Sequence, residues 1–132
     1  MAQKYRNCQT TVSLLNYHFV WIVRRRRPIL EGVLDQRLKE LIVQAASTID
    51  CEILDLETDK DHVHLFINCL PTLAPNQIIQ RIKGFTSHEL RQEFPWLKTK
   101  LPSLWTRSYF VSTAGRVSGD TIRRYIDSQP SR

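Results

Sequence analysis

Apolar residues along the chain recur with the period of a strand in some segments and with that of a helix in others. Residues 12–23 are rich in β-branched and aromatic side chains and contain no Gly or Pro, which predicts a buried central strand. Residues 33–49 instead carry an apolar residue every three or four positions, which predicts an amphipathic helix. The same criteria predict strands over 51–58, 62–70 and 108–113, and helices over 75–94 and 119–129.

The order of these segments is strand, helix, strand, strand, helix, strand, with one more helix at the end. This β-α-β-β-α-β order predicts an α+β, ferredoxin-like fold, in which an antiparallel four-stranded sheet carries helices on one face. We expect Asp59 and Asp61 to form a hairpin turn rather than to bind metal. The basic stretch 95–103 contains prolines and predicts a loop. At 132 residues the chain is long enough for one core, so we assign 1–132 to a single domain.

The chain carries a formal net charge of +6, which favours a polyanionic partner, most often a nucleic acid. The four arginines that follow the first strand could be a solvated strand end, but a DNA-facing surface is the interpretation we favour. Trp96, Trp105 and Phe85 could stack on unpaired bases, with core packing as an equal alternative for each. The basic residues expected on the DNA-facing surface are Arg24, Arg25, Arg26, Arg27, Arg81, Lys83, Lys98, Lys100, Arg107 and Arg116.

The cysteines and the hydropathy of the chain indicate in which cellular compartment the protein is expected. Cys8, Cys51 and Cys69 are odd in number and form no C-x-x-C pair, which suits a reducing cytosol better than a disulfide framework. No leader-like segment follows Met1, and no apolar run is long enough to cross a membrane. We therefore expect a cytoplasmic protein without a membrane partner.

Two histidines one residue apart, His62 and His64, lie in the strand predicted over 62–70. Because side chains alternate along a strand, both histidines share one face with Phe66, and Cys69 points to the other. The Cα atoms of the two histidines would be roughly 6.6 Å apart, so their imidazoles can approach one metal ion. Histidines in this arrangement are more often surface residues than metal ligands. A metal site is the better interpretation only if a third ligand comes from elsewhere in the fold.

The last predicted helix brings further reactive groups. Ile122 and Ile126 are four residues apart and form its apolar stripe. Tyr125 and Gln129 are also four apart, so they share a helix face beside that stripe. If this helix lies on the histidine strand, the phenol and the amide oxygen can reach one site. Otherwise Tyr125 is an ordinary half-buried packing residue.

Three motifs occur together in this chain. They are the histidine pair around a hydrophobic residue (the HUH signature), Tyr-Phe-Val-Ser-Thr-Ala-Gly at 109–115 and Tyr-Ile-Asp-Ser-Gln at 125–129. In this order and spacing they resemble the single-tyrosine transposases of the IS200/IS605 insertion-sequence family. Tyr-His-Phe-Val-Trp at 17–21 and Arg-Ile-Lys-Gly at 81–84 also resemble the family's pattern, so the resemblance spans nearly the whole chain.

The resemblance implies a metal-dependent transposase that cuts and rejoins single-stranded DNA at the hairpin-forming ends of an insertion sequence. His62, His64 and Gln129 would bind Mg²⁺ or Mn²⁺, and Tyr125 would form a 5′-phosphotyrosine intermediate on the last helix, at about 118–129. In the family the protein is a homodimer, and the tyrosine helix of one subunit completes the histidine site of the other. The sequence leaves open whether the helix closes onto its own histidines or onto those of a partner.

Two alternatives remain at this stage. One is an enzyme of the same chemistry, either a domesticated repeat-associated tyrosine transposase or a nickase of replication or conjugation. The other is a binding module: an inactive copy that binds DNA hairpins, or an RNA-binding ferredoxin-like domain. The RNA-binding alternative needs an aromatic sheet signature, Lys/Arg-Gly-Phe/Tyr-Gly/Ala-Phe-Val, which the sequence lacks.

Overall fold

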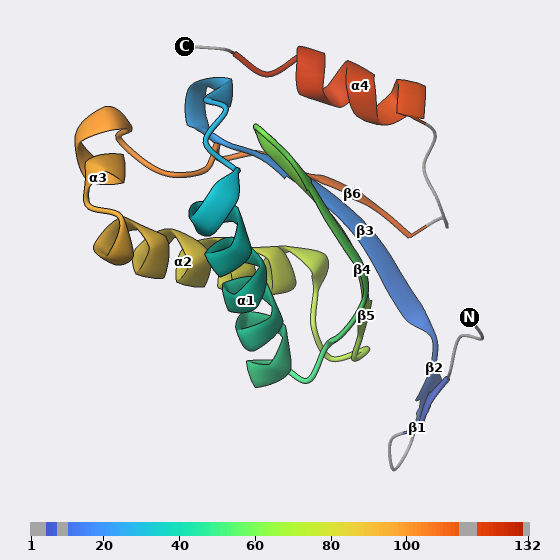
Figure 1. Cartoon of the computed structure of the whole chain (residues 1–132). Coiled ribbons are helices and arrows are strands. Elements are labelled where there is room, and N and C mark those ends of the chain that lie inside the picture. The colour runs from blue at the N-terminus through green and yellow to red at the C-terminus, as the bar shows by residue number, and fades with distance from the viewer. Residues whose placement is uncertain (1–4, 8–10, 114–118, 131–132) are drawn as a thin grey trace.

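A four-stranded antiparallel sheet forms the centre of the protein (Figure 1). The structure is a computed structural model that describes residues 5–7, 11–113 and 119–130. The strand order β4-β5-β3-β6, with every neighbouring pair antiparallel, is that of a ferredoxin-like fold and confirms the predicted architecture. The strands are β3 (Leu15–Ile22), β4 (Glu52–Asp59), β5 (His62–Cys69) and β6 (Phe110–Ser112).

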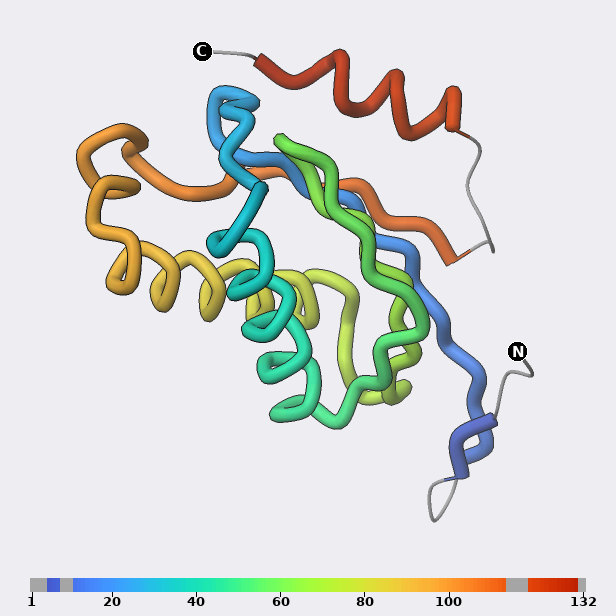
Figure 2. The backbone as a smooth tube through the Cα atoms, viewed as in Figure 1, coloured from blue at the N-terminus to red at the C-terminus, as the bar shows by residue number. Residues whose placement is uncertain are grey.

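Two long helices cover one face of the sheet, and a third helix lies on the other side (Figures 1 and 2). The long helices are α1 (Gly32–Thr48) and α2 (Pro75–Glu93), close to the predicted bounds. Helix α2 begins at Pro75 because proline suits the first helical position, and the Gln77 side chain accepts a hydrogen bond of 2.8 Å from the Ala74 N–H. The third helix is α4 (Gly119–Asp127).

The main core lies between the sheet and the two long helices. Phe19 and Trp21 of β3, together with Leu65 of β5, are fully buried in it, in agreement with the buried central strand predicted over 12–23. Trp105 also belongs to this core: its ring stands edge-on to Trp21, and its Nε1–H donates to Thr86 Oγ1 over 3.1 Å. Core packing is therefore the role of Trp105, rather than stacking on bases.

A second, smaller apolar cluster lies on the opposite face of the sheet. Val20 and Ile22 of β3 are packed there against Ile122 and Ile126 of α4, which confirms the predicted apolar stripe of this helix. The helix that bears Tyr125 is thus held on the sheet by a small contact. Apart from α4, no helix in the described part of the chain covers this side of the sheet, which we call the open face (Figure 1).

Four details differ from the sequence-based expectations. The strand expected over 12–23 is divided: Val12–Ser13 pairs with Arg6–Asn7 as a separate two-stranded ribbon (β2 and β1), and β3 begins at Leu15. At its other end, β3 is followed by the 3₁₀ turn η1 (Arg24–Arg26). The loop expected over 95–103 contains the short helix α3 (Trp96–Lys100), which buries Leu97 against the core.

The last difference concerns β6, which is shorter than the strand expected over 108–113. Before the N-terminal end of β6, the ammonium group of Lys83 binds the backbone. It donates to the carbonyl oxygens of Thr106 (2.7 Å) and Ser108 (3.0 Å). These carbonyls are therefore bound by a side chain of α2 instead of a neighbouring strand.

Two cysteines meet on the helix-covered side of the sheet. Cys51 and Cys69 are free, buried thiols with their Sγ atoms 3.1 Å apart. Cys69 belongs to the main core, on the face opposite the histidines, as predicted. Cys8 lies outside the described residues. No helix in the described part of the chain is long and apolar enough to cross a membrane.

Candidate active site on the open face of the sheet

The histidine pair lies on the open face of β5. In the strand register His62 is opposite Ile22 and His64 is opposite Val20, so both histidines share a face with the apolar cluster beneath α4. The two imidazole rings are adjacent, with 4.8 Å between their centroids. His62 is buried and His64 is half-buried. The predicted placement of the pair is therefore correct.

Asp61 fixes the orientation of His62. Its Oδ1 lies 2.7 Å from Nδ1 of His62, so the carboxylate accepts a hydrogen bond from the Nδ1–H and leaves Nε2 as the ring atom with a free lone pair. Metal-binding histidines commonly have a carboxylate partner of this kind. Sequence reasoning assigned Asp61 to the turn and missed this contact, although its position directly before the pair was a usable signal.

His64 is held in its neutral form. Burial is the main reason that its pKa falls from the ordinary value to about 4, and the neighbouring His62 and His18 lower the pKa further. The ring of His18 on β3 lies 5.8 Å from that of His64, measured between centroids. A neutral imidazole has a lone pair to offer, so His64 can act as a metal ligand at neutral pH.

Tyr125 and Gln129 meet at Ser108, a residue that sequence reasoning did not consider. The Ser108 hydroxyl oxygen lies 2.9 Å from the Tyr125 hydroxyl and 2.8 Å from Oε1 of Gln129. Ser108 has one hydroxyl proton, and Oε1 can only accept, so Ser108 donates to Gln129 and accepts from Tyr125. Gln129 lies just beyond the end of α4, where its Nε2 donates to Ser128 Oγ over 3.2 Å.

The Tyr125 phenol is a weak acid in this setting. Burial raises its pKa above the ordinary value, and the Ser108 hydroxyl opposes that rise, because it can rotate to donate a hydrogen bond to the ionised phenol oxygen. Tyr125 is therefore protonated at neutral pH and needs a proton acceptor before it can act as a nucleophile.

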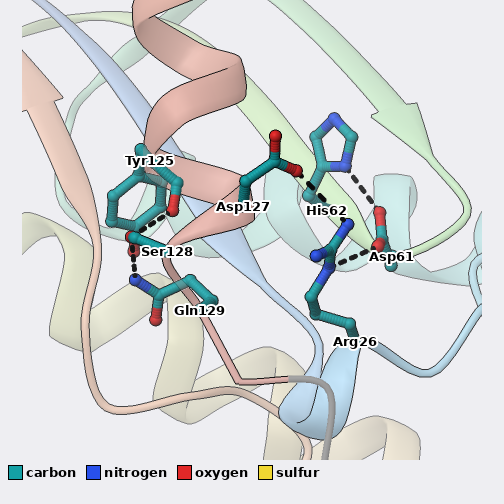
Figure 3. A network of polar contacts seen from close by, with 7 residues as sticks. All are labelled: Arg26, Asp61, His62, Tyr125, Asp127, Ser128 and Gln129. Carbon is teal, nitrogen blue, oxygen red and sulfur yellow. Dashed lines mark hydrogen bonds and ion pairs between the residues drawn. The ribbon is translucent and has the colours of Figure 1, made fainter.

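The structure brings Tyr125 and Gln129 together, but it does not join them to the histidines. Figure 3 shows Tyr125 and Gln129 to one side of Asp127, and His62 with Asp61 to the other. Among the described residues, no group of three or more His, Cys, Asp or Glu side chains could hold a metal ion. A ligand of another type, such as the amide of Gln129, would have to complete the site, so its ligation stays a prediction.

Several of the basic residues expected to face DNA have partners within the protein. Arg26 pairs with Asp61 and Asp127, Arg24 donates to Ser103 Oγ over 3.4 Å, and the ammonium group of Lys83 is bound by two carbonyls. Burial lowers the pKa of Lys83 to about 8. DNA contacts by these residues stay predictions. Five of the basic residues expected to face DNA have exposed side chains: Arg27, Arg81, Lys98, Lys100 and Arg107. Arg25 is half-buried, and Arg116 lies outside the described residues.

Replacing Ser108 by alanine is expected to raise the pKa of Tyr125. The substitution removes the hydrogen bond that lowers this pKa and leaves the burial that raises it. An ultraviolet titration of tyrosinate, taken as the difference from the same protein with Tyr125→Phe, isolates this phenol from the other three tyrosines. Ser47→Ala, which removes an exposed hydroxyl on α1, is the control and should leave the pKa unchanged. An unchanged pKa in Ser108→Ala would show that the Ser108 contact is absent in solution.

Comparison with known proteins places this arrangement in a family. The family model described as "Transposase IS200 like" matches residues 11–129. The ISDra2 transposase TnpA of Deinococcus radiodurans is 32% identical over 120 residues, which cover 89% of this chain and 86% of the relative. The IS200 transposase of Salmonella typhimurium is 27% identical over 115 residues, covering 86% of this chain and 75% of the relative.

Solved structures agree with this placement. A candidate transposase from Deinococcus radiodurans superimposes with a TM-score of 0.89 at 27% identity, covering 96% of this chain and 99% of the other. A REP-associated tyrosine transposase bound to a REP hairpin has a TM-score of 0.59 at 15% identity, with coverages of 92% and 68%, and shares the fold. With the family model matching nearly the full length and the fold shared with solved relatives, the chain belongs to the IS200-like transposase family.

Proposed function

We propose that this IS200-type transposase cuts and rejoins single-stranded DNA through a covalent 5′-phosphotyrosine intermediate, with Tyr125 as the nucleophile. One observation carries the proposal: α4, which bears Tyr125, packs onto the same face of the sheet that holds His62 and His64. A phenol nucleophile and an imidazole pair on one face are groups that a metal-assisted phosphoryl transfer can use.

The histidine pair fits a divalent metal ion. Asp61 leaves Nε2 of His62 available, and the low pKa of His64 keeps that ring neutral. We propose Mg²⁺ or Mn²⁺ as the ion, because the third ligand we propose, Gln129, offers a hard amide oxygen. When bound, the ion would stabilise negative charge on the scissile phosphate and on the departing 3′ oxygen.

The tyrosine supplies the exchange chemistry. At the reference pKa of about 10, only roughly 0.1% of a phenol is ionised at neutral pH, so the Tyr125 proton must be transferred to an acceptor. The phenol oxygen then bonds to phosphorus, and the bond from phosphorus to the 3′ oxygen breaks, which releases a 3′-OH. A different 3′-OH later attacks the same phosphorus and releases Tyr125 with its proton restored. One phosphodiester is exchanged for another, so no ATP is consumed.

We propose single-stranded DNA with hairpin ends as the substrate. The net charge of +6 and the exposed side chains of Arg27, Arg81 and Arg107 suit a phosphate backbone. The REP-associated transposase that shares this fold was solved bound to a REP hairpin. We further propose a homodimer in which the tyrosine helix of one subunit completes the histidine site of the other. This arrangement would free Tyr125 and Gln129 from Ser108, which holds both of them in the single chain.

Labelled single-stranded DNA that carries a hairpin end tests the proposal. With Mg²⁺ or Mn²⁺ the protein is expected to form a covalent adduct that survives denaturing electrophoresis, and EDTA should prevent it. The same sequence annealed as a full duplex is the control and should yield little adduct. Equal cleavage of the duplex, or adduct formation in EDTA, would contradict the proposal.

A further inference from the structure

Arg26 has an unusual backbone conformation, in the turn that follows β3. It belongs to η1, which Val23 separates from β3, and both Arg25 (φ 60°) and Arg26 (φ 52°) have left-handed backbone conformations. Residues other than glycine adopt this conformation rarely, and it persists only where the surroundings enforce it. Here hydrogen bonds fix the turn: the Arg26 N–H donates to the Val23 carbonyl over 2.8 Å, and the Arg24 N–H donates to the Leu104 carbonyl over 2.8 Å.

The side chain of Arg26 joins two parts of the candidate active site (Figure 3). Its Nε lies 3.4 Å from Oδ2 of Asp61, the carboxylate whose other oxygen holds Nδ1 of His62. Its Nη2 lies 3.8 Å from Oδ1 of Asp127, which is in α4 two residues after Tyr125. The guanidinium of Arg26 therefore contacts both the carboxylate that orients His62 and the helix that carries Tyr125.

We propose that Arg26 is a positioning residue that couples the docking of α4 to the orientation of His62. The inference rests on the proposed function, since it assumes that His62 binds metal and that α4 carries the nucleophile. A guanidinium is always charged and has donors that point in fixed directions, so it can serve two carboxylates at once. In this proposal Arg26 acts through Asp61 and Asp127 rather than by direct contact with metal or DNA.

The two contacts differ in strength in a way that suits coupling. The Arg26 and Asp61 side chains are only 26% and 20% exposed, so water screens their ion pair incompletely. Asp127 is 57% exposed and its contact is longer, so that ion pair is weak and can break when α4 moves. The Asp61 contact thus keeps Arg26 beside the histidine site, and the Asp127 contact forms only when α4 is docked on the sheet.

Two measurements on the DNA-free protein test the proposal: the dissociation constant for Mn²⁺ and the rate of amide hydrogen exchange in α4. Arg26→Ala is expected to weaken Mn²⁺ binding by roughly 10-fold, the effect typical of losing an outer-shell partner, and to speed exchange in α4. Arg26→Lys, which keeps the charge, should partly restore both. Asp127→Asn should speed exchange in α4 and, because coupling is reciprocal, should also weaken Mn²⁺ binding, by less than Arg26→Ala does.

Arg27→Ala is the matched control, because it removes the same charge from the next residue, which is exposed. It should change neither readout. Wild-type values for both readouts in a folded Arg26→Ala protein would overturn the coupling, and so would equal effects of Arg26→Ala and Arg27→Ala. Weaker hairpin binding in Arg26→Ala with both readouts unchanged would identify Arg26 as a DNA contact instead. A wild-type protein that binds no Mn²⁺ and forms no adduct would overturn the proposed function, and the coupling with it.

Discussion

Tyr125→Phe is expected to lower covalent adduct formation by more than about 1,000-fold, to the background of the assay, while hairpin binding stays at the wild-type level. Loss of the attacking group removes the step itself, and losses of this size are typical when a nucleophile is deleted. The remaining phenylalanine ring can keep its packing against Phe110, whose ring centroid lies 5.9 Å from that of Tyr125. The only group lost is the hydroxyl that contacts Ser108, so the fold should be preserved.

A matched control distinguishes the loss of the nucleophile from the loss of any one tyrosine hydroxyl. Tyr17→Phe removes a tyrosine hydroxyl from the helix-covered side of the sheet, away from the open face, and should leave adduct formation intact. Trypsin cleavage after Arg124 yields a peptide of residues 125–132 in which Tyr125 is the only tyrosine. Mass spectrometry should find the nucleotide on this peptide. An adduct that persists in Tyr125→Phe, or that maps to another peptide, would contradict the assignment.

The sequence predicted those parts of the fold and site that depend on local periodicity. Alternation along β5 correctly placed His62 and His64 on the face opposite Val63 and Leu65, because a strand fixes side-chain direction residue by residue. The spacing of Ile122 and Ile126 likewise identified the face by which α4 packs onto the sheet. Such relations are set within one element, so the sequence is enough to find them.

Contacts between elements distant in the chain could not be predicted in this way. Ser108 meets Tyr125 and Gln129, which lie 17 and 21 residues away, and nothing in its local sequence marks it. Lys83 was assigned to a DNA surface because it is charged, yet its ammonium binds two carbonyls from a segment more than 20 residues away. These roles follow from how α2, β6 and α4 pack together, and periodicity carries no information about that packing.

His64→Ala is expected to weaken Mn²⁺ binding by at least about 100-fold and to abolish adduct formation, with hairpin binding retained. Losing a ligand should cost more than the 10- to 100-fold typical of losing an outer-shell partner. The half-buried imidazole is neutral, so its removal leaves no unpaired charge in the fold. Calorimetric titration with Mn²⁺ measures the affinity. His88→Ala is the control, since His88 lies on α2 with its side chain 65% exposed; it should bind Mn²⁺ like the wild type. Unchanged Mn²⁺ affinity in His64→Ala would overturn its role as a ligand.

Mixing the two inactive variants then decides which chain supplies the tyrosine. In a dimer whose sites combine the histidines of one subunit with the helix of the other, a pairing of His64→Ala with Tyr125→Phe has one site that lacks both groups and one that is intact. Random exchange of subunits should therefore restore about a quarter of the wild-type sites. In the single chain α4 is docked on its own sheet. If it also completes the site of its own chain during the reaction, every site in the mixture lacks either His64 or the Tyr125 hydroxyl, and the mixture stays inactive. Recovery of adduct in the mixture would thus support transfer of the helix between subunits, and its absence would contradict the dimer proposed above.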